Sequence, residues 1–138
     1  AVARPDAPEQ SALFLSEYAA DGTPLPSDRL TADDITRSGL RADVVVLSAC
    51  ATGDGRELRG EGVLGLTYGF LANGSHTVIA SLWPVEDALT ARFMEEFYTA
   101  YRVSGHAAGA LRTAQLRTRG GMASNVWSSF VVRSNQLP

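Results

Sequence analysis

The chain has 138 residues, of which 45% are hydrophobic and 20% charged, and its formal net charge is −3. These values are typical of one globular domain large enough to bury its own core. The net charge is small and the sequence has no basic stripe of the kind that binds duplex DNA or RNA, so we expect no nucleic-acid partner. No apolar run approaches the roughly 20 residues of a membrane span, so we expect no membrane partner. The single cysteine excludes an internal disulfide and fits a reducing cytoplasm.

The first ten residues carry no apolar core of a signal peptide and are expected to form a polar linker. Residues 11–134 are expected to form the folded domain, and residues 135–138 a tail. Hydrophobic patterns predict strands over 11–16, 43–49, 76–84 and 125–134, and helices over 30–39, 61–74, 85–101 and 106–117, with an exposed loop over 17–29. Strands that alternate with helices indicate an α/β class with a mainly parallel sheet.

Local signals support several of these helices. Thr31 is a suitable N-cap for the helix over 30–39, and Gly39 stands where a terminating glycine belongs. Before its Asn73-Gly74 stop, the helix over 61–74 contains Gly62, Gly65 and Gly69, each costing about 1 kcal/mol, which suggests close packing against another backbone. In the helix over 106–117, the expected inward positions are Ala107, Ala110, Leu111 and Ala114.

The stretch DVVVLSACATGDG, residues 43–55, joins an apolar strand to a glycine-rich loop. An apolar run without alternation is typical of an inner parallel strand covered on both faces. Its one thiol, Cys50, lies at the carboxyl end of the strand, where α/β sheets gather ligands and reacting groups. Cys50 is either a small buried hydrophobe or a nucleophile. A nucleophile needs a base, donors for the oxyanion and room for the substrate.

Other polar residues leave several interpretations open. Glu86 and Asp87 follow the next strand, where they either compensate a helix dipole or line a pocket for a basic side chain. The loop over 53–62 lacks a P-loop pattern, although anion binding at the following helix start stays open. His76 precedes a strand and His106 opens a helix, and both are expected to be solvated surface residues. One cysteine and two histidines offer no metal-ligand spacing, and we expect no cofactor.

Several motifs in order resemble the CHAT family of caspase-like, separase-related cysteine peptidases. They are ADVVVLSACATGDG, GEGVLGLTYGFLANGSHTVIASLWPVEDALTARFMEEFY, AGALRTAQ and VWSSFVV, and the resemblance extends over residues 11–134. It implies a caspase-like sandwich, with a mainly parallel sheet between helices. It also implies a bacterial, cytoplasmic protein associated with tetratricopeptide repeats.

The resemblance also implies roles for individual residues. Cys50 matches the family's nucleophile, whose thiolate attacks a peptide carbonyl to give a thioester. Ser48, Ala49 and Asp87 correspond to positions at the substrate cleft, and a basic residue before the scissile bond is one option. The partners implied are a protein or peptide substrate and a tetratricopeptide-repeat segment or another protein.

One departure from the family concerns the catalytic base. In this family the catalytic histidine belongs to a His-Gly pair upstream of the segment at 11–16, and this chain has no His-Gly pair. We therefore expect the C-terminal portion of a CHAT peptidase, without the first strands of its sheet and weak or inactive alone. The exposed sheet edge would favour self-association. Three functions stay open: an endopeptidase with its histidine elsewhere, a non-catalytic interaction module, and an anion-binding domain.

Overall fold

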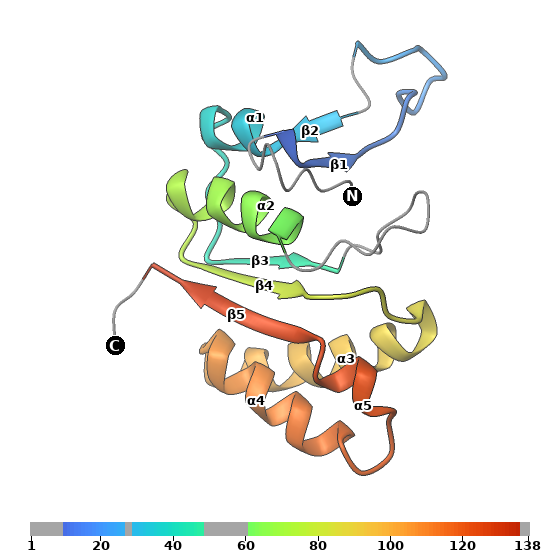
Figure 1. Ribbon diagram of the computed structural model, residues 1–138, viewed down its shortest axis with the longest axis vertical. Helices are drawn as coiled ribbons and strands as arrows, with labels where there is room; N and C mark the ends of the chain where they lie inside the picture. Colours follow the sequence, from blue (N-terminus) through green and yellow to red (C-terminus); the bar gives the residue numbers. More distant parts are fainter. Residues whose placement is uncertain (1–9, 27–28, 49–60, 136–138) are drawn as a thin grey trace.

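The computed structural model describes residues 10–26, 29–48 and 61–135 (Figure 1). In chain order its elements are β1 (Ala12–Phe14), β2 (Arg29–Thr31), α1 (Ala32–Arg37), β3 (Val44–Leu47), α2 (Glu61–Ala72), β4 (Thr77–Ser81), α3 (Asp87–Ser104), α4 (Ala107–Thr118), α5 (Ser124–Trp127) and β5 (Phe130–Ser134). The alternation of strands and helices confirms the α/β class. In this part of the chain, no helix has both the length and the apolar character to cross a membrane.

The larger sheet has β4 in its middle, with the strand order β3-β4-β5. β4 runs parallel to β3, with Leu47 beside Ala80, and antiparallel to β5, with Ile79 beside Val132. Within the described residues the sheet is therefore mixed rather than mainly parallel. β3, expected as an inner strand, lies at the edge of this sheet.

The reversed direction of β5 has a topological cause. A single helix between two strands returns the chain to the edge from which the first strand started, and the strands are then parallel. Here two long helices, α3 and α4, lie between β4 and the short helix α5 that precedes β5, and they pack side by side on one face (Figure 1). α3 carries the chain to the edge where β4 begins, and α4 carries it back. β5 therefore starts where β4 ends and runs the opposite way.

Side chains alternate between the two faces of the sheet, and both faces are covered. One face packs against α1 and α2 through Val45, Leu47, Val78 and Ala80. The other packs against α3 and α4 through Val44, Val46, Ile79, Phe130 and Val132. Figure 1 shows the two groups of helices on opposite sides of the strands. The apolar run of β3 thus has the two-sided cover that its sequence predicts.

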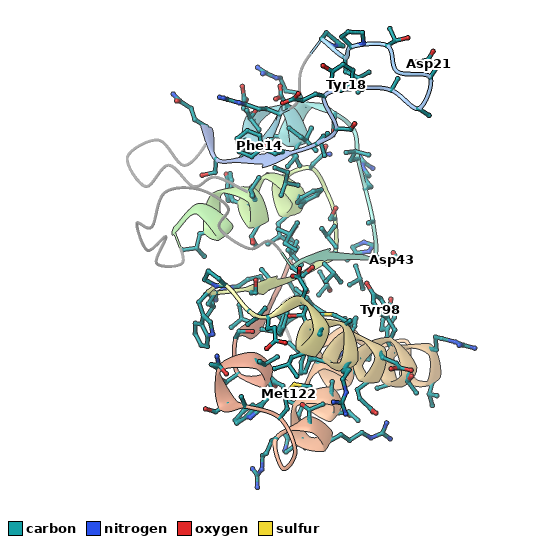
Figure 2. All side chains as sticks on the ribbon, turned by 90° about the vertical axis from the view of Figure 1, so that its right-hand side faces the viewer. Phe14, Tyr18, Asp21, Asp43, Tyr98 and Met122 are labelled. Carbon is teal, nitrogen blue, oxygen red and sulfur yellow. The ribbon has the colours of Figure 1, made fainter. Side chains whose placement is uncertain are left out.

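The N-terminal part of the domain includes a strand that the sequence pattern did not predict. β2 pairs antiparallel with β1, with Leu13 beside Leu30. Three residues, one of them charged, are too short a stretch for a period-two pattern to be recognised. Residues 17–26, which lie between the two strands, project from the molecule (Figure 1). Figure 2 places Tyr18 and Asp21 at the end of the molecule remote from Met122.

Helix α1 begins with a capping box. Thr31 Oγ1 accepts a hydrogen bond of 3.0 Å from Asp34 N, and the Asp34 carboxylate accepts one of 3.0 Å from Thr31 N. Ser38 is the C-cap, and the next residue, Gly39, has a φ of 72°, which glycine adopts without strain. Both ends of this helix confirm the predicted caps.

Helix α2 approaches α1 closely at one glycine. A Cβ on Gly69 would stand 2.8 Å from the backbone oxygen of Ala32. This contact confirms the close packing that the glycine-rich sequence suggests. The absence of a side chain at Gly69 therefore sets how near α1 lies to α2.

The C-terminal segment differs from its prediction at one end. Residues 125–134 were expected to be one strand, but α5 occupies Ser124–Trp127 and β5 begins only at Phe130. Phe130 stacks on Phe93 of α3, with 4.9 Å between ring centroids. In α4, the four residues expected to point inward are all buried: Ala107, Ala110, Leu111 and Ala114.

Replacing Gly69 by alanine tests the approach of α1 and α2. Alanine gains about 1 kcal/mol of helix propensity, but overpacking in a core costs about 1–3 kcal/mol. Because the clash is with backbone, we expect a net loss of about 1–2 kcal/mol, measured by urea unfolding. Gly120→Ala is the control, since a Cβ there meets nothing within 4 Å. Equal stability of the two variants would contradict the packing argument.

The capping box also predicts a pH dependence. Hydrogen bonds from the Thr31 hydroxyl, and then from its backbone N–H, lower the pKa of the Asp34 carboxyl below its ordinary value. A carboxyl whose pKa is lower in the folded state adds stability above its unfolded pKa, and this stability is lost as pH falls through the folded pKa. In Thr31→Ala, we expect stability to decrease less below about pH 4 than it does in the parent. Thr31→Ser keeps the hydroxyl donor, so its stability should decrease as much as that of the parent. Thermal unfolding across acidic pH measures the difference.

Candidate active site

The parallel pairing of β3 and β4 brings two strand ends to one edge of the sheet. Because Leu47 lies beside Ala80, the following residues Ser48 and Ser81 are level with each other. We call this end the carboxyl edge, and the opposite end, where β3 and β4 begin, the amino edge. Ser48 is exposed, whereas Ser81 is buried. Ala49 and Cys50 follow Ser48 directly in the sequence but lie outside the described residues.

The segment after β4 adds an aromatic and an acidic side chain to the carboxyl edge. Trp83 is partly exposed, and Val85 is buried in the core beside α3. Glu86 occupies the N-cap position of α3 without a side-chain capping bond, and Asp87 is the first helical residue. Both carboxylates are exposed. The carboxyl edge therefore combines the strand end that leads to Cys50 with the acidic start of α3.

The two histidines of the chain both lie at the amino edge. His76 precedes β4, and its Nδ1 lies 3.1 Å from Asp43 Oδ1, just before β3. Figure 2 labels Asp43 at the start of β3. His106 precedes α4, and the two imidazoles line one cavity of about 470 Å³. Because His76 directly precedes β4, it lies at the amino edge, remote from the carboxyl edge.

The contacts of His106 further limit its chemistry. Its Nδ1 accepts a hydrogen bond of 3.0 Å from Gly109 N, which caps the first turn of α4. In a neutral imidazole that accepts at Nδ1, the proton resides on Nε2, so Nε2 is a donor and not a base. A Cβ on Gly109 would stand 3.1 Å from Nδ1, so a side chain there would require the imidazole to shift slightly. His106 is exposed, as expected of a solvated surface residue, but its capping role was not predicted from the sequence.

Two other expectations concern bound ions. Within residues 10–26, 29–48 and 61–135, no three His, Cys, Asp or Glu side chains are grouped so that they could hold a metal ion. The loop over 53–62, considered for anions, lies outside the described residues except for its last two positions.

Comparison with known proteins agrees with the motifs. The CHAT domain family matches residues 1–135. Two curated relatives, tetratricopeptide repeat protein 28 from Mus musculus and from Homo sapiens, are each 32% identical to this chain over 120 residues. The match covers 84% of this chain and 5% of each relative, so the chain spans about one twentieth of their length. Both relatives are named after tetratricopeptide repeats, and the sequence motifs predicted an association with such repeats. Because the family match extends over nearly the whole sequence, the chain belongs to the CHAT domain family.

Proposed function

We propose that this chain is the nucleophile-bearing part of a CHAT-type cysteine endopeptidase. Cys50 follows β3 by three residues, and β3 ends at the carboxyl edge beside the end of β4. This position is the observation that carries the proposal, because α/β sheets present reacting groups at that edge. Helices on both faces of the sheet also agree with a caspase-like sandwich.

The proposed reaction proceeds in two steps. The Cys50 thiolate forms a C–S bond with the peptide carbonyl carbon while the peptide C–N bond breaks, and the leaving amine takes up a proton. Water then cleaves the thioester and releases the new carboxylate. Ser48, Ala49 and Asp87 would line the substrate cleft. The acidic pair Glu86 and Asp87 favours a basic substrate side chain.

The general base of this reaction comes from outside the sequence printed here. The sequence has two histidines, and both lie at the amino edge. Within the described residues, β3 pairs with β4 on one side and has no strand on the other. A strand that pairs with this open edge would bring its own end to the carboxyl edge, where an imidazole could reach Cys50. General-base assistance is commonly worth 10²–10⁴-fold in rate, so this chain alone is expected to be weakly active or inactive.

A non-catalytic interaction module of the same fold is the second candidate. The observation that favours it is the outer face of α2, where Leu64 and Tyr68 lie one turn apart and are 46% and 73% exposed. Exposed apolar side chains on one face are typical of protein contacts. The partner would be a tetratricopeptide-repeat segment, another protein, or a second copy bound at the open sheet edge. In either role we place the protein in the cytoplasm, where a lone thiol stays reduced.

The pH profile of Cys50 alkylation by iodoacetamide tests the origin of the base. In this chain we expect the thiol to titrate as a free cysteine does, near pH 8.5. His76→Ala and His106→Asn should leave the profile unchanged, and asparagine keeps the cap on α4. In a longer version with a His-Gly strand upstream, the midpoint should fall below neutrality. A low midpoint in the short chain that His76→Ala abolishes would refute the proposal.

Replacing Cys50 by alanine separates the two candidate functions. In the full-length protein we expect cleavage of its protein substrate to be lost, because alanine offers no nucleophile. Thermal unfolding of the purified variant should match the parent and serves as the control. Retention of the cellular function by this variant would favour the interaction module instead.

A further inference from the structure

Trp83 ties the segment after β4 to a distant part of the chain. Its indole Nε1 donates a hydrogen bond of 2.6 Å to the backbone carbonyl of Asn125, 42 residues further on. Asn125 belongs to what we call the α5 corner, residues 124–130. The Trp83 side chain is 39% exposed, so it combines a bonded N–H with ring surface open to solvent.

The α5 corner is anchored in the core of the domain. Val126 and Ser129 are buried, and Ser129 Oγ donates a hydrogen bond of 2.7 Å to Val126 O. From α4, Gln115 Nε2 donates a hydrogen bond of 3.1 Å to Phe130 O. The carbonyl that receives the Trp83 indole is therefore part of a corner whose position is set by α4 and by the start of β5.

Two other attachments lie on either side of Trp83 in the sequence. Leu82 N donates a hydrogen bond of 2.9 Å to Ser129 O, and the Val85 side chain is buried in the core. Residues 82–86 connect β4 to α3 and lead directly into Asp87. Their path therefore decides where the acidic start of α3 stands relative to the end of β3.

We propose that Trp83 is a positioning residue that fixes the substrate-side segment 82–87 against the α5 corner. The assignment rests on the proposed peptidase function and adds to it an element, α5, that is far from Cys50 in the sequence. The indole bond holds the segment in one conformation, and the acidic pair is then presented to the substrate without further ordering. Loss of this hydrogen bond should slow reactions of Cys50 with reagents that bind along the segment. Reactions with small reagents that contact only the thiol should keep their rate.

The first measurement follows the Trp83 indole N–H of the unmodified chain by NMR hydrogen exchange. Trp127 packs against the core and is less exposed than Trp83, so the reference is free N-acetyltryptophanamide, whose indole N–H is open to water. We expect the Trp83 indole proton to exchange more slowly than that of the reference, because a hydrogen-bonded N–H is protected from exchange. Exchange at the rate of the reference would overturn the assignment, and no substitution is needed for this result.

The second measurement compares two variants by backbone amide exchange. Trp83→Phe removes the donor and keeps an aromatic ring, whereas Asn125→Ala keeps the acceptor, which is a backbone carbonyl. We expect amides in residues 82–87 to exchange about fivefold faster in Trp83→Phe, the effect of one ordinary hydrogen bond. They should be unchanged in Asn125→Ala. An increase that extends through β4, or no increase, would show that the bond does not position this segment.

The third measurement links the segment to the substrate, in the full-length protein. Trp83→Phe should slow modification of Cys50 by a peptidyl chloromethyl ketone several-fold, while modification by iodoacetamide stays within about twofold. An unchanged ratio would refute the positioning role. If Cys50 of the parent protein reacted no faster with the peptidyl reagent than with iodoacetamide, the peptidase proposal would be refuted. The hydrogen-exchange measurements would then still show whether Trp83 positions the segment.

Discussion

The parallel pairing of β3 with β4 is the interaction from which the candidate site follows. Parallel strands end together, so the register that sets Leu47 beside Ala80 also sets the start of the Cys50 segment beside the segment leading to Asp87. A slip of one residue would turn every side chain of β3 to the other face. Because each face of β3 packs against its own set of helices, such a slip would misplace both halves of the core.

The same pairing distributes the candidate reactive side chains between two opposite edges of the sheet. The thiol segment and the acidic pair follow the carboxyl ends of the strands, whereas His76 and His106 lie at the amino ends. Each imidazole has a local partner: Asp43 for His76, and the Gly109 N–H for His106. Within the described residues, both histidines thus lie at the edge opposite the strand end that leads to Cys50. The proposed peptidase reaction would therefore need a base from another segment, and the side of β3 that no described strand occupies is the proposed position for it.

Much of this fold could be predicted from local patterns, for identifiable reasons. The caps at Thr31 and Gly39 are short-range features that depend on neighbouring residues alone. The buried face of α4 follows from helical periodicity. β2 and α5 escaped prediction because three or four residues carry too little periodicity. The capping role of His106 was missed as well, since histidine is not among the residues preferred at an N-cap.

By itself, the sequence determined the alternating elements, the two-sided burial of β3, the position of Cys50 after a buried strand, and the absence of a His-Gly pair. These are properties of consecutive residues and of composition. Only the tertiary structure decided the direction of β5, the meeting of His76 and His106 at one cavity, and the contact between Trp83 and Asn125. Each of these depends on how the α3–α4 pair returns the chain across the sheet. Such a path joins residues tens of positions apart, which no local pattern encodes.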